Sequence, residues 1–568
     1  MSDEKKSHVE TVKLESNYLR GTLGEELAVD TDSFTKDSTH VLKHYGTYQQ
    51  DDRDTRAERR AQGLTGKTYS FMVRTRIPGG KLTSQQLLAQ LDLADELGNT
   101  TLRITSRQGL QLHGILKTNL RETIRRINET QLSTLGACGD VNRNVMCCPA
   151  PYTQTLYRQV QALADQLADH LAPRTPAYHE LWLSDLDSGE KTLVGGGKPE
   201  EVEPIYGQHY LPRKFKIGIG FPFDNCVDIY THDIGLLAVV RDDQLVGYNV
   251  LVGGGQGTTP AAAKTFPALG QRMAFVTPDR VVDVATAIVK VQRDFGNRED
   301  RKVARLKYLV HRWGLPRFKA KVEEYYGQPL ADPEPEDVTG HNDHLGWDQQ
   351  GDGRWFYGLN IENGRILDND SMQLKSALRE LCTRLEPGIR LTAHQSLLLT
   401  DIQGEQRDEV EAILRRHQVK LSDQISTVRR WSMACVAWPT CGLAITDSER
   451  VLPGVIDQLE LELAKLGLED EPFTVRMTGC PNGCARPYNS DVGLVGKARG
   501  RYTVLVGGRL LGNRLNFIYR ELVPLEEIVP TLVPLLTYFK QDRMAGESFG
   551  DFCHRKGLED LTAWANQT

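Results

Sequence analysis

The amino-acid sequence repeats itself, and this repetition restricts the possible folds more than any other feature. The segment LRITSRQGLQL at 102–112 has a counterpart, IRLTAHQSLLL, at 389–399, an offset of 287 residues. Cys147 falls opposite Cys435 at nearly the same offset. A near-constant offset between separate matches is the signature of a duplicated structural unit.

Two further matches extend the repeat in both directions. RIPGGKL at 76–82 is similar to NIENGRI at 360–366, and VGYNVLVGGG at 246–255 is similar to RYTVLVGG at 501–508. We therefore expect two related units, roughly 65–335 and 340–568, behind an N-terminal extension. The predicted boundaries, in chain order, are an extension at 1–62, a small repeat at 63–140, a larger module at 141–339, a second small repeat at 340–422 and a second larger module at 423–568.

Within the first small repeat, hydrophobic periodicity predicts a helix followed by two strands, which is an α+β pattern. Thr83 and Gln86 have the spacing of a capping box, and an apolar helical stripe then runs to Gly98. Two strands follow around a turn near 106–109, with apolar residues at the even positions. The opposite sheet face therefore gathers Arg103, Thr105, Arg107, Gln111 and His113. In the second copy, Arg390 and Thr392 correspond to Arg103 and Thr105. Gln111 and His113 are replaced there by Leu398 and Thr400.

Composition excludes several classes of protein. The 568 residues are too many for one domain, and 39% hydrophobic with 25% charged residues is typical of a globular protein. A net charge of −6, spread along the chain, argues against nucleic-acid binding. The charged N-terminus has no signal-peptide core, and no apolar run is long enough to cross a membrane. We therefore expect a cytoplasmic protein.

The ten cysteines are unevenly distributed along the chain. Four of them lie within fifty residues, in ACVAWPTC and TGCPNGC, and these are Cys435, Cys441, Cys480 and Cys484. The gaps of five and three residues differ from the usual zinc-ribbon and ferredoxin spacings. Four cysteines without histidine favour an iron–sulfur cluster, and spacing leaves zinc or no metal open. The others are expected to be buried bystanders: Cys138, Cys147, Cys148, Cys226, Cys382 and Cys553.

Basic residues recur two apart in strand-like segments, so that both members of a pair lie on one face. Arg74 pairs with Arg76, Lys214 pairs with Lys216, and Arg143 stands just before Cys147. Cations gathered on inward-facing strands of an acidic protein predict a bound anion. The stretch LVGGGQG lacks the G-x-G-x-x-G spacing of a dinucleotide site. We therefore expect electrons for any redox chemistry to come from a partner.

Several motifs together resemble those of the assimilatory sulfite reductases. They are the two cysteine motifs, ESNYLRG at 15–21, HYGTYQQDDRD at 44–54, LPRKFK at 211–216, ENGRILD at 362–368 and VGLVGKA at 492–498. The cysteine motif covers the wider sulfite and nitrite reductase family. The N-terminal motifs narrow the likeness to hemoprotein subunits of NADPH-dependent bacterial enzymes. The resemblance runs from about residue 12 to residue 552.

The resemblance implies an α+β, pseudo-twofold duplicated sulfite and nitrite reductase fold, with two ferredoxin-like half-domains and two larger α/β modules. It also implies a siroheme whose iron shares a cysteine thiolate with a [4Fe–4S] cluster. The cluster ligands would be Cys435, Cys441, Cys480 and Cys484, of which Cys484 would bridge to the siroheme.

The same resemblance implies the roles of the polar residues and the reaction. The anion pocket would be formed by Arg74, Arg143, Lys214 and Lys216, and the macrocycle would be held by Arg103, Thr105, Arg107, Gln111, His113 and Asn482. The reaction would be the six-electron reduction of sulfite to sulfide for cysteine biosynthesis, fed by an NADPH-oxidising flavoprotein with FAD and FMN. The alternatives are a siroheme nitrite reductase, a ferredoxin-dependent sulfite reductase and, remotely, a non-catalytic zinc-stapled scaffold.

Overall fold

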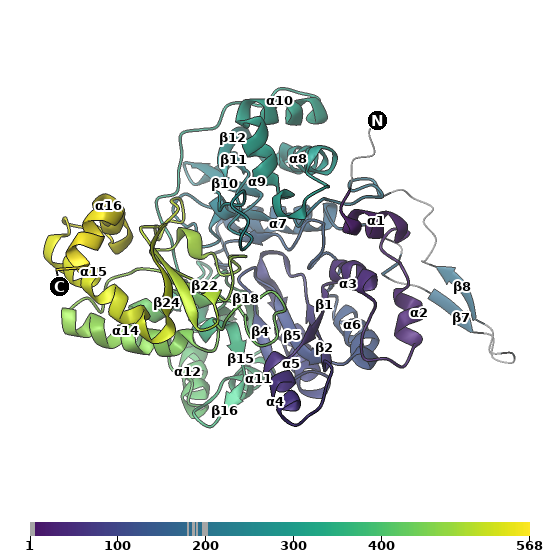
Figure 1. The fold of residues 1–568 in the computed structure, drawn as a ribbon, viewed down its shortest axis with the longest axis horizontal. Helices are drawn as coiled ribbons and strands as arrows, with labels where there is room; N and C mark the ends of the chain where they lie inside the picture. Colours follow the sequence, from purple (N-terminus) through teal and green to yellow (C-terminus); the bar gives the residue numbers. More distant parts are fainter. Residues whose placement is uncertain are drawn as a thin grey trace.

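Four five-stranded sheets form the framework of the protein (Figure 1). The structure is a computed structural model, and it describes residues 6–175, 177–178, 181–184, 188, 191–195 and 203–567. Two of the sheets contain the predicted small repeats, and the other two lie in the larger modules. Among the described residues, no helix is both long and apolar enough to cross a membrane.

The two sheets of the small repeats have equivalent strand orders. The first sheet contains, in spatial order, β1 (Thr47–Asp51), β2 (Tyr69–Arg74), β5 (Leu110–Ile115), β4 (Leu102–Ile104) and β15 (Arg365–Ile366). The second contains β13 (Gly346–Gln349), β14 (Trp355–Leu359), β19 (Leu397–Ile402), β18 (Gly388–Leu391) and β3 (Lys81–Thr83). The repeat detected in the sequence therefore corresponds to a structural duplication.

Each small sheet takes its last strand from the other half of the chain. β15 pairs antiparallel with β4, and β3 pairs antiparallel with β18. Gly80 and Gly364 lie at equivalent points of this exchange, with φ of 75° and 76°. A Cβ at either position would collide with a backbone carbonyl oxygen of the opposite half, that of Leu391 or of Ile104. The two halves are therefore interlocked rather than simply adjacent.

The two larger modules also share one strand order. The first sheet contains β6 (Met146–Cys147), β9 (Ile217–Gly220), β10 (Ile234–Arg241), β11 (Gln244–Val252) and β12 (Gln271–Val276). The second contains β20 (Ser432–Ala434), β21 (Val475–Thr478), β22 (Val492–Ala498), β23 (Arg501–Val506) and β24 (Phe517–Pro524). The first three strands of each sheet are parallel and the rest antiparallel. The equivalent β11 and β23 are the segments of the weaker third sequence match.

Helices cover these sheets and join the modules. The N-terminal segment contains α1 (His8–Glu15), α2 (Leu23–Ala28), α3 (Lys36–Leu42) and α4 (Arg53–Ala61). The small repeats carry α5 (Ser84–Glu96), α6 (Leu120–Glu129), α11 (Leu374–Arg384) and α12 (Arg407–Arg416). The first large module carries α7 (Thr155–His170), α8 (Val281–Phe295), α9 (Leu306–Trp313) and α10 (Leu315–Tyr326). The second carries α13 (Thr427–Arg430), α14 (Leu452–Leu466), α15 (Ile528–Asp542) and α16 (Phe549–Ala565).

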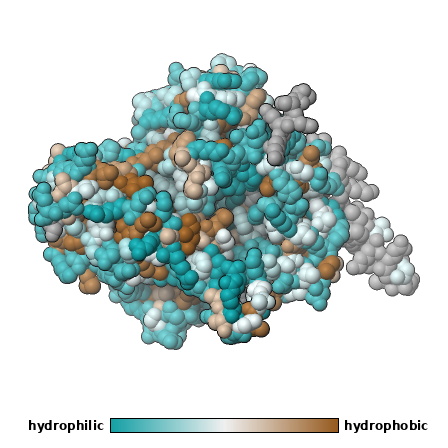
Figure 2. Space-filling model, in the orientation of Figure 1, coloured by the Kyte–Doolittle hydropathy of each residue, from teal (hydrophilic) through white to brown (hydrophobic). Residues whose placement is uncertain are grey.

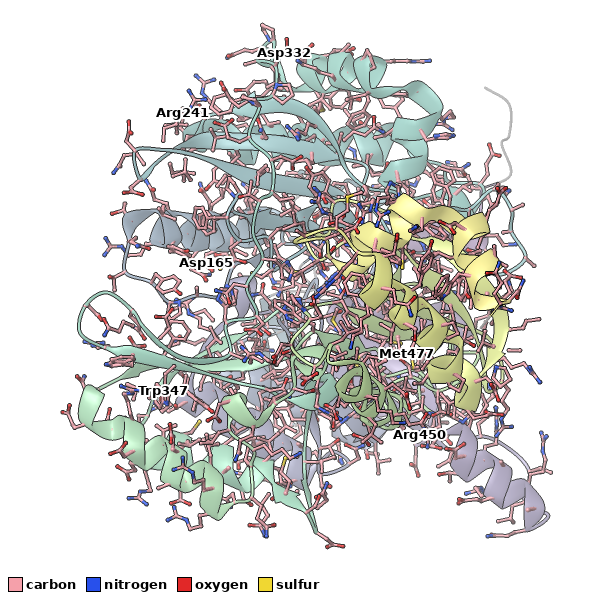
Figure 3. All side chains as sticks on the ribbon, turned by 90° about the vertical axis from the view of Figure 1, so that its left-hand side faces the viewer. Asp165, Arg241, Asp332, Trp347, Arg450 and Met477 are labelled. Carbon is pink, nitrogen blue, oxygen red and sulfur yellow. The ribbon has the colours of Figure 1, made fainter. Side chains whose placement is uncertain are left out.

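The second large module has a hydrophobic core of its own, whereas the other three sheets share one continuous core. Figure 3 faces the C-terminal helices, with Met477 of β21 labelled in their midst and Arg241 at the far upper edge. Two short hairpins complete the described elements. They are β7 (Leu181–Ser184) with β8 (Lys191–Gly195), and β16 (Asp368–Asn369) with β17 (Met372–Gln373).

The local predictions for the first small repeat are confirmed. The helix runs from Ser84 to Glu96, and Thr83 and Gln86 form a reciprocal capping box. The two strands β4 and β5 flank the predicted turn. Their polar face is buried rather than solvated, since Arg103, Thr105, Gln111 and His113 are each less than a tenth exposed. Buried polar groups require partners, and this face is therefore part of a site.

Candidate active site

The four clustered cysteines lie on two loops that leave the same edge of the second large sheet. Cys435 directly follows β20 and Cys480 follows β21, and these strands pair in parallel. Cys480 is buried, Cys435 and Cys441 are half-buried, and Cys484 is exposed. Burial and then the charge of Cys484 raise the pKa of Cys435 well above its usual range, and that of Cys480 to about 11. The structure thus brings the four predicted ligands into one group.

The separation of these sulfurs distinguishes between kinds of metal centre. A single zinc ion with four thiolates would hold its sulfurs about 3.8 Å apart. Among the described residues, some ligand atoms form groups of three or more in which all atoms lie within 4.8 Å of one another. These four cysteines are not in any such group. The four thiols therefore fit a larger, multinuclear cluster better than one ion. Asn482 donates to Cys480 Sγ at 3.3 Å and supports the loop.

The cationic residues converge because two parallel strands of the first large sheet begin side by side. Arg143 precedes β6, and Lys214 and Lys216 precede β9. The backbone N–H of Arg143 donates to the carbonyl of Phe215 at 2.9 Å, which places it between the two lysines. Arg74 ends β2 in the neighbouring small sheet. The structure therefore assembles all four predicted anion-binding residues from three separate segments.

The two lysines have no direct bonding partner among the described residues. Among the described residues, neither Nζ has a hydrogen-bond or ion-pair partner. Burial, and then the charges of Arg213 and Arg305, lower the pKa of Lys214 to about 7. Burial and the charge of Arg107 lower the pKa of Lys216 well below its usual range. The two lysines are half-buried, and a partly desolvated cation without a partner is costly, so this arrangement is suited to a bound anion.

Two further polar atoms of the predicted macrocycle face also lack partners. Arg107 Nε and His113 Nε2 are buried without a hydrogen bond to any described group. Burial, and then the charges of Arg143 and Arg486, lower the pKa of Arg107 to about 9. Burial lowers the pKa of His113 well below its usual range. A ligand rich in carboxylates, such as siroheme, would satisfy these groups.

The remaining predicted residues hold the site in other ways. Arg103 donates to Glu449 at 2.8 Å and to the carbonyl of Ala434 at 2.9 Å, which fixes the start of the first cysteine loop. Thr105 Oγ1 accepts the backbone N–H of Gly109 at 3.1 Å and so closes the β4–β5 turn. The Gln111 amide faces the Arg74 guanidinium. Direct contact of Arg103, Thr105 and Gln111 with a cofactor stays a prediction.

Several residues of the site were missed in the sequence. Cys138, expected to be a bystander, accepts a hydrogen bond from Arg74 Nη1 at 2.9 Å, and Tyr48 lies beside the same thiol. The Tyr48 segment, HYGTYQQDD at 44–52, matches HLGWDQQGD at 344–352. That repeat was detectable and would have placed both segments at equivalent positions.

The Gly-rich stretch also takes part in the site, although not as a nucleotide loop. Lys307 donates to the carbonyls of Gly255 and Gly257 at 2.9 and 2.8 Å. Thr258 in turn donates its backbone N–H to the carbonyl of Pro481 at 2.8 Å. The stretch therefore supports the second cysteine motif from the first half of the molecule.

The fold and the site define a duplicated redox protein in which a group of four cysteines lies near a group of cationic side chains. The chain belongs to the nitrite and sulfite reductase family. A family model for the nitrite and sulphite reductase 4Fe-4S domain matches residues 138–330 and 426–568. A second model, for the ferredoxin-like half domain of these reductases, matches residues 64–130 and 348–417.

Individual relatives agree with this assignment. The chain is 45% identical over 98% of its length to the sulfite reductase [NADPH] hemoprotein beta-component of Staphylococcus haemolyticus, 96% of which is covered. It is also 45% identical, over 97% of its length, to the protein of the same name from Paenibacillus sp., 95% of which is covered. The solved structure of the Mycobacterium tuberculosis NirA protein is similar with a TM-score of 0.77 at 26% identity, over 98% of both chains.

Proposed function

We propose that the chain is the hemoprotein component of an NADPH-dependent assimilatory sulfite reductase, which reduces sulfite to sulfide by six electrons. The observation that carries this proposal is the pair of amino groups of Lys214 and Lys216, for which the described part of the chain provides no partner. They belong to a cationic group of side chains near the four-cysteine centre, since the charge of Cys484 acts on both lysines.

Siroheme and a [4Fe–4S] cluster, when bound, would supply the redox chemistry. Cys435, Cys441, Cys480 and Cys484 would hold the cluster, with Cys484 shared between the two groups. Arg107 and His113 would hold carboxylates of the macrocycle through atoms that otherwise have no partner among the described residues. Ser106 Oγ donates to the carbonyl of Cys484 at 2.9 Å, which ties the turn of this polar face to the bridging position.

The cationic residues would bind and orient the sulfite dianion. Arginine offers planar, permanently charged donors, and Arg143 is fixed by two hydrogen bonds to the carbonyl of Gly139, at 3.0 and 2.9 Å. Each oxygen of sulfite must leave as water, which requires protons at the substrate. A lysine whose pKa is about 7, as for Lys214, exchanges protons readily near neutral pH. We therefore assign proton delivery to the lysines and charge stabilisation to the arginines.

Electrons would enter from a flavoprotein subunit through the surface near Cys441. Leu443 is 69% exposed on this loop, and apolar side chains gather over the C-terminal module in Figure 2. Arg53 of α4 donates to the carbonyls of Pro439, Cys441 and Ala444, so the N-terminal segment braces this loop. The protein would act in the cytoplasm, where NADPH is available.

The proposal is tested by activity with reduced methyl viologen and by sulfide formation. We expect the purified protein to show a siroheme spectrum and to reduce sulfite in preference to nitrite. Lys216→Met should lower kcat/KM for sulfite at least tenfold, whereas Lys302→Met, on an exposed lysine, should not change it. A colourless protein, or a strong preference for nitrite, would contradict the proposed function. Addition of the cognate flavoprotein and NADPH tests the electron donor.

A further inference from the structure

A second group of metal-ligating side chains joins the two halves of the molecule and contains none of the four clustered cysteines. It consists of Cys148, Asp224, Cys226 and His344, whose ligand atoms all lie within 4.8 Å of one another. All four residues are buried, with Cys226 only 1% exposed. Cys148 follows β6, Asp224 and Cys226 follow β9, and His344 precedes β13 of the second half.

The distances within this group correspond to a tetrahedral metal site. Cys148 Sγ lies 3.0 Å from Asp224 Oδ2 and 3.6 Å from His344 Nε2. His344 Nε2 lies 3.0 Å from the same Asp224 oxygen. A tetrahedral zinc ion with sulfur, nitrogen and oxygen ligands would separate them by about 3.3–3.8 Å. Small shifts would therefore complete the coordination shell.

The carboxylate is held in the orientation that a metal ligand needs. Asp224 Oδ1 accepts the backbone N–H groups of Cys226 and Asn342, at 3.1 and 3.2 Å. Its second oxygen, Oδ2, is thereby directed toward the thiol and the imidazole. Such support of a ligand by neighbouring backbone groups is typical of metal sites.

The pseudo-twofold symmetry places this group opposite the cluster cysteines. Cys226 in FDNC at 223–226 corresponds to Cys484 in PNGC at 481–484. Two residues further on, Asp228 and Arg486 have left-handed backbones with φ of 52° and 54°, each followed by a 3₁₀ turn and the equivalent strand β10 or β22. The same backbone frame thus presents a thiol in both halves, but with different companion residues.

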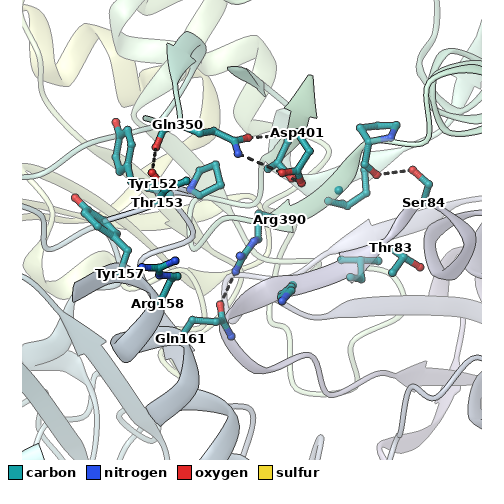
Figure 4. Close-up of a pocket in the computed structure, with 18 of the residues that line it drawn as sticks. Thr83, Ser84, Tyr152, Thr153, Tyr157, Arg158, Gln161, Gln350, Arg390 and Asp401 are labelled. Carbon is teal, nitrogen blue, oxygen red and sulfur yellow. Dashed lines mark hydrogen bonds between the residues drawn. The ribbon is translucent and has the colours of Figure 1, made fainter. Parts of the chain in front are cut away.

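The group is reachable from a cavity of about 760 Å³ between the halves, which Cys148 helps to line. Figure 4 shows this cavity, with Tyr152 and Tyr157 on one side. Arg390 donates a hydrogen bond to Gln161 within it. A metal site requires an entry path for the ion, and this cavity provides one.

We propose that Cys148, Asp224, Cys226 and His344 bind one zinc ion. Two thiolates, one imidazole and one carboxylate form a donor set that suits zinc, which is redox-inactive and would take no part in electron transfer. On binding, the two thiols would lose their protons to solvent as the zinc–sulfur bonds form. The His344 imidazolium, which faces the Asp224 carboxylate at 3.0 Å, would lose one proton to solvent as its Nε2 binds the ion. Because His344 comes from the second half, the ion would fasten the second small repeat to the first large module.

The test measures zinc in the complete, cofactor-loaded protein, independently of activity. After anaerobic purification and dialysis against zinc-containing and then zinc-free buffer, we expect about one zinc per chain by mass spectrometry of the elements. X-ray absorption at the zinc edge should show two sulfurs at about 2.3 Å and two lighter ligands at about 2.0 Å. The iron content serves as an internal reference, because the proposed cluster and siroheme lie elsewhere.

Variants then assign the zinc to these residues. Cys226→Ser and His344→Gln should each lower the zinc content at least fivefold while the iron content is retained. Cys382→Ser, at a buried cysteine outside the group, should retain both metals. The wild-type measurement decides the question even where a variant fails to fold. Less than about a tenth of a zinc per chain in the wild type, a zinc edge without two sulfurs, or a Cys148–Cys226 disulfide in the anaerobic protein would each overturn the proposal.

Discussion

Asp228 and Arg486 occupy equivalent positions in the two halves of the chain and form an ion pair with each other, with Nε 2.5 Å from Oδ2. Two equivalent positions that touch must lie at the pseudo-twofold axis. Arg476 Nη1 approaches the same Asp228 oxygen at 2.8 Å, and all three side chains are buried. Burial alone would raise the pKa of Asp228, but the charges of Arg476 and Arg486 outweigh it and hold the pKa well below its usual range.

Removal of this carboxylate should destabilise the whole molecule. Asp228→Asn leaves two buried guanidinium groups without a counter-charge, and breaking a buried ion pair in this way costs about 3–5 kcal/mol. The measurement is urea unfolding of the anaerobic protein followed by far-UV circular dichroism. Arg125→Gln removes two ion pairs at an exposed helix surface and should leave the unfolding midpoint nearly unchanged. Equal midpoints for Asp228→Asn and the wild type would show that the axis contact does not stabilise the fold.

A second prediction tests which cysteines are cluster ligands and which are not. Cys484→Ser should abolish sulfite reduction with reduced viologen, because the residue proposed to hold both cofactors would be lost. Cys382→Ser should retain activity and iron content, since this cysteine is buried in α11, away from both metal groups. Iron analysis and electronic absorption spectra check both variants. Comparable losses in the two variants would mean that the motif does not identify the ligands.

The fold was largely predictable because duplication leaves a signal in the sequence. The repeats at 102–112 and 389–399 became equivalent hairpins. The alternation of polar and apolar residues placed Arg103 and Thr105 on one face, and the structure shows that this face is buried. The exchange of β3 and β15 between the sheets was not predictable. A strand of two or three residues is too short to show a distinctive periodicity. The strand with which it pairs lies in the other half of the chain, so no local pattern indicates the pairing.

The site was predictable where residue chemistry is distinctive and not where it depends on tertiary contact. The clustering of the motif cysteines and the two-residue spacing of the LPRKFK lysines singled these residues out, and the family resemblance then implied their roles. Cys138 and Cys226 are single cysteines in sequence, and only the fold brings Cys138 to Arg74 and Cys226 to Cys148 and His344. Arg103 carries the predicted charge, but Glu449 neutralises it from a position 346 residues away. No local pattern encodes a contact of that length.

Lys214 should make sulfite binding depend on pH in a defined direction. Because the pKa of Lys214 is lowered to about 7, the side chain loses its charge as the pH rises above that value. The KM for sulfite should therefore rise with pH above 7, by roughly up to tenfold per unit. Steady-state kinetics between pH 6 and 9 measure this effect.

The variant Lys214→Arg distinguishes the titration of the lysine from that of the substrate, because sulfite itself titrates in this pH range. Arginine stays charged throughout, so the ratio of wild-type KM to variant KM should increase with pH. The substrate's own titration cancels in that ratio. A ratio that does not vary with pH would show that Lys214 keeps its proton in the loaded enzyme, or that it does not contact sulfite.

The N-terminal segment gives a prediction about the life of the cluster. Arg53 stacks on Trp438 with its guanidinium 3.7 Å from the ring centroid, and it donates to three carbonyls of the first cysteine loop. Arg53→Ala removes the side chain that covers this loop, so oxygen and water should reach the cluster more easily. We expect the visible absorbance of the protein to decay several-fold faster in air, while anaerobic activity falls less.

The matched control for Arg53→Ala is Arg60→Ala, which changes an exposed arginine of the same helix. This variant also removes one positive charge but leaves the cysteine loop covered. Its visible absorbance should therefore decay in air at the same rate as that of the wild type. Faster decay in both variants would attribute the effect to charge or to helix stability. Faster decay in Arg53→Ala alone would show that the segment ahead of the duplicated unit protects a cluster bound entirely by the second half.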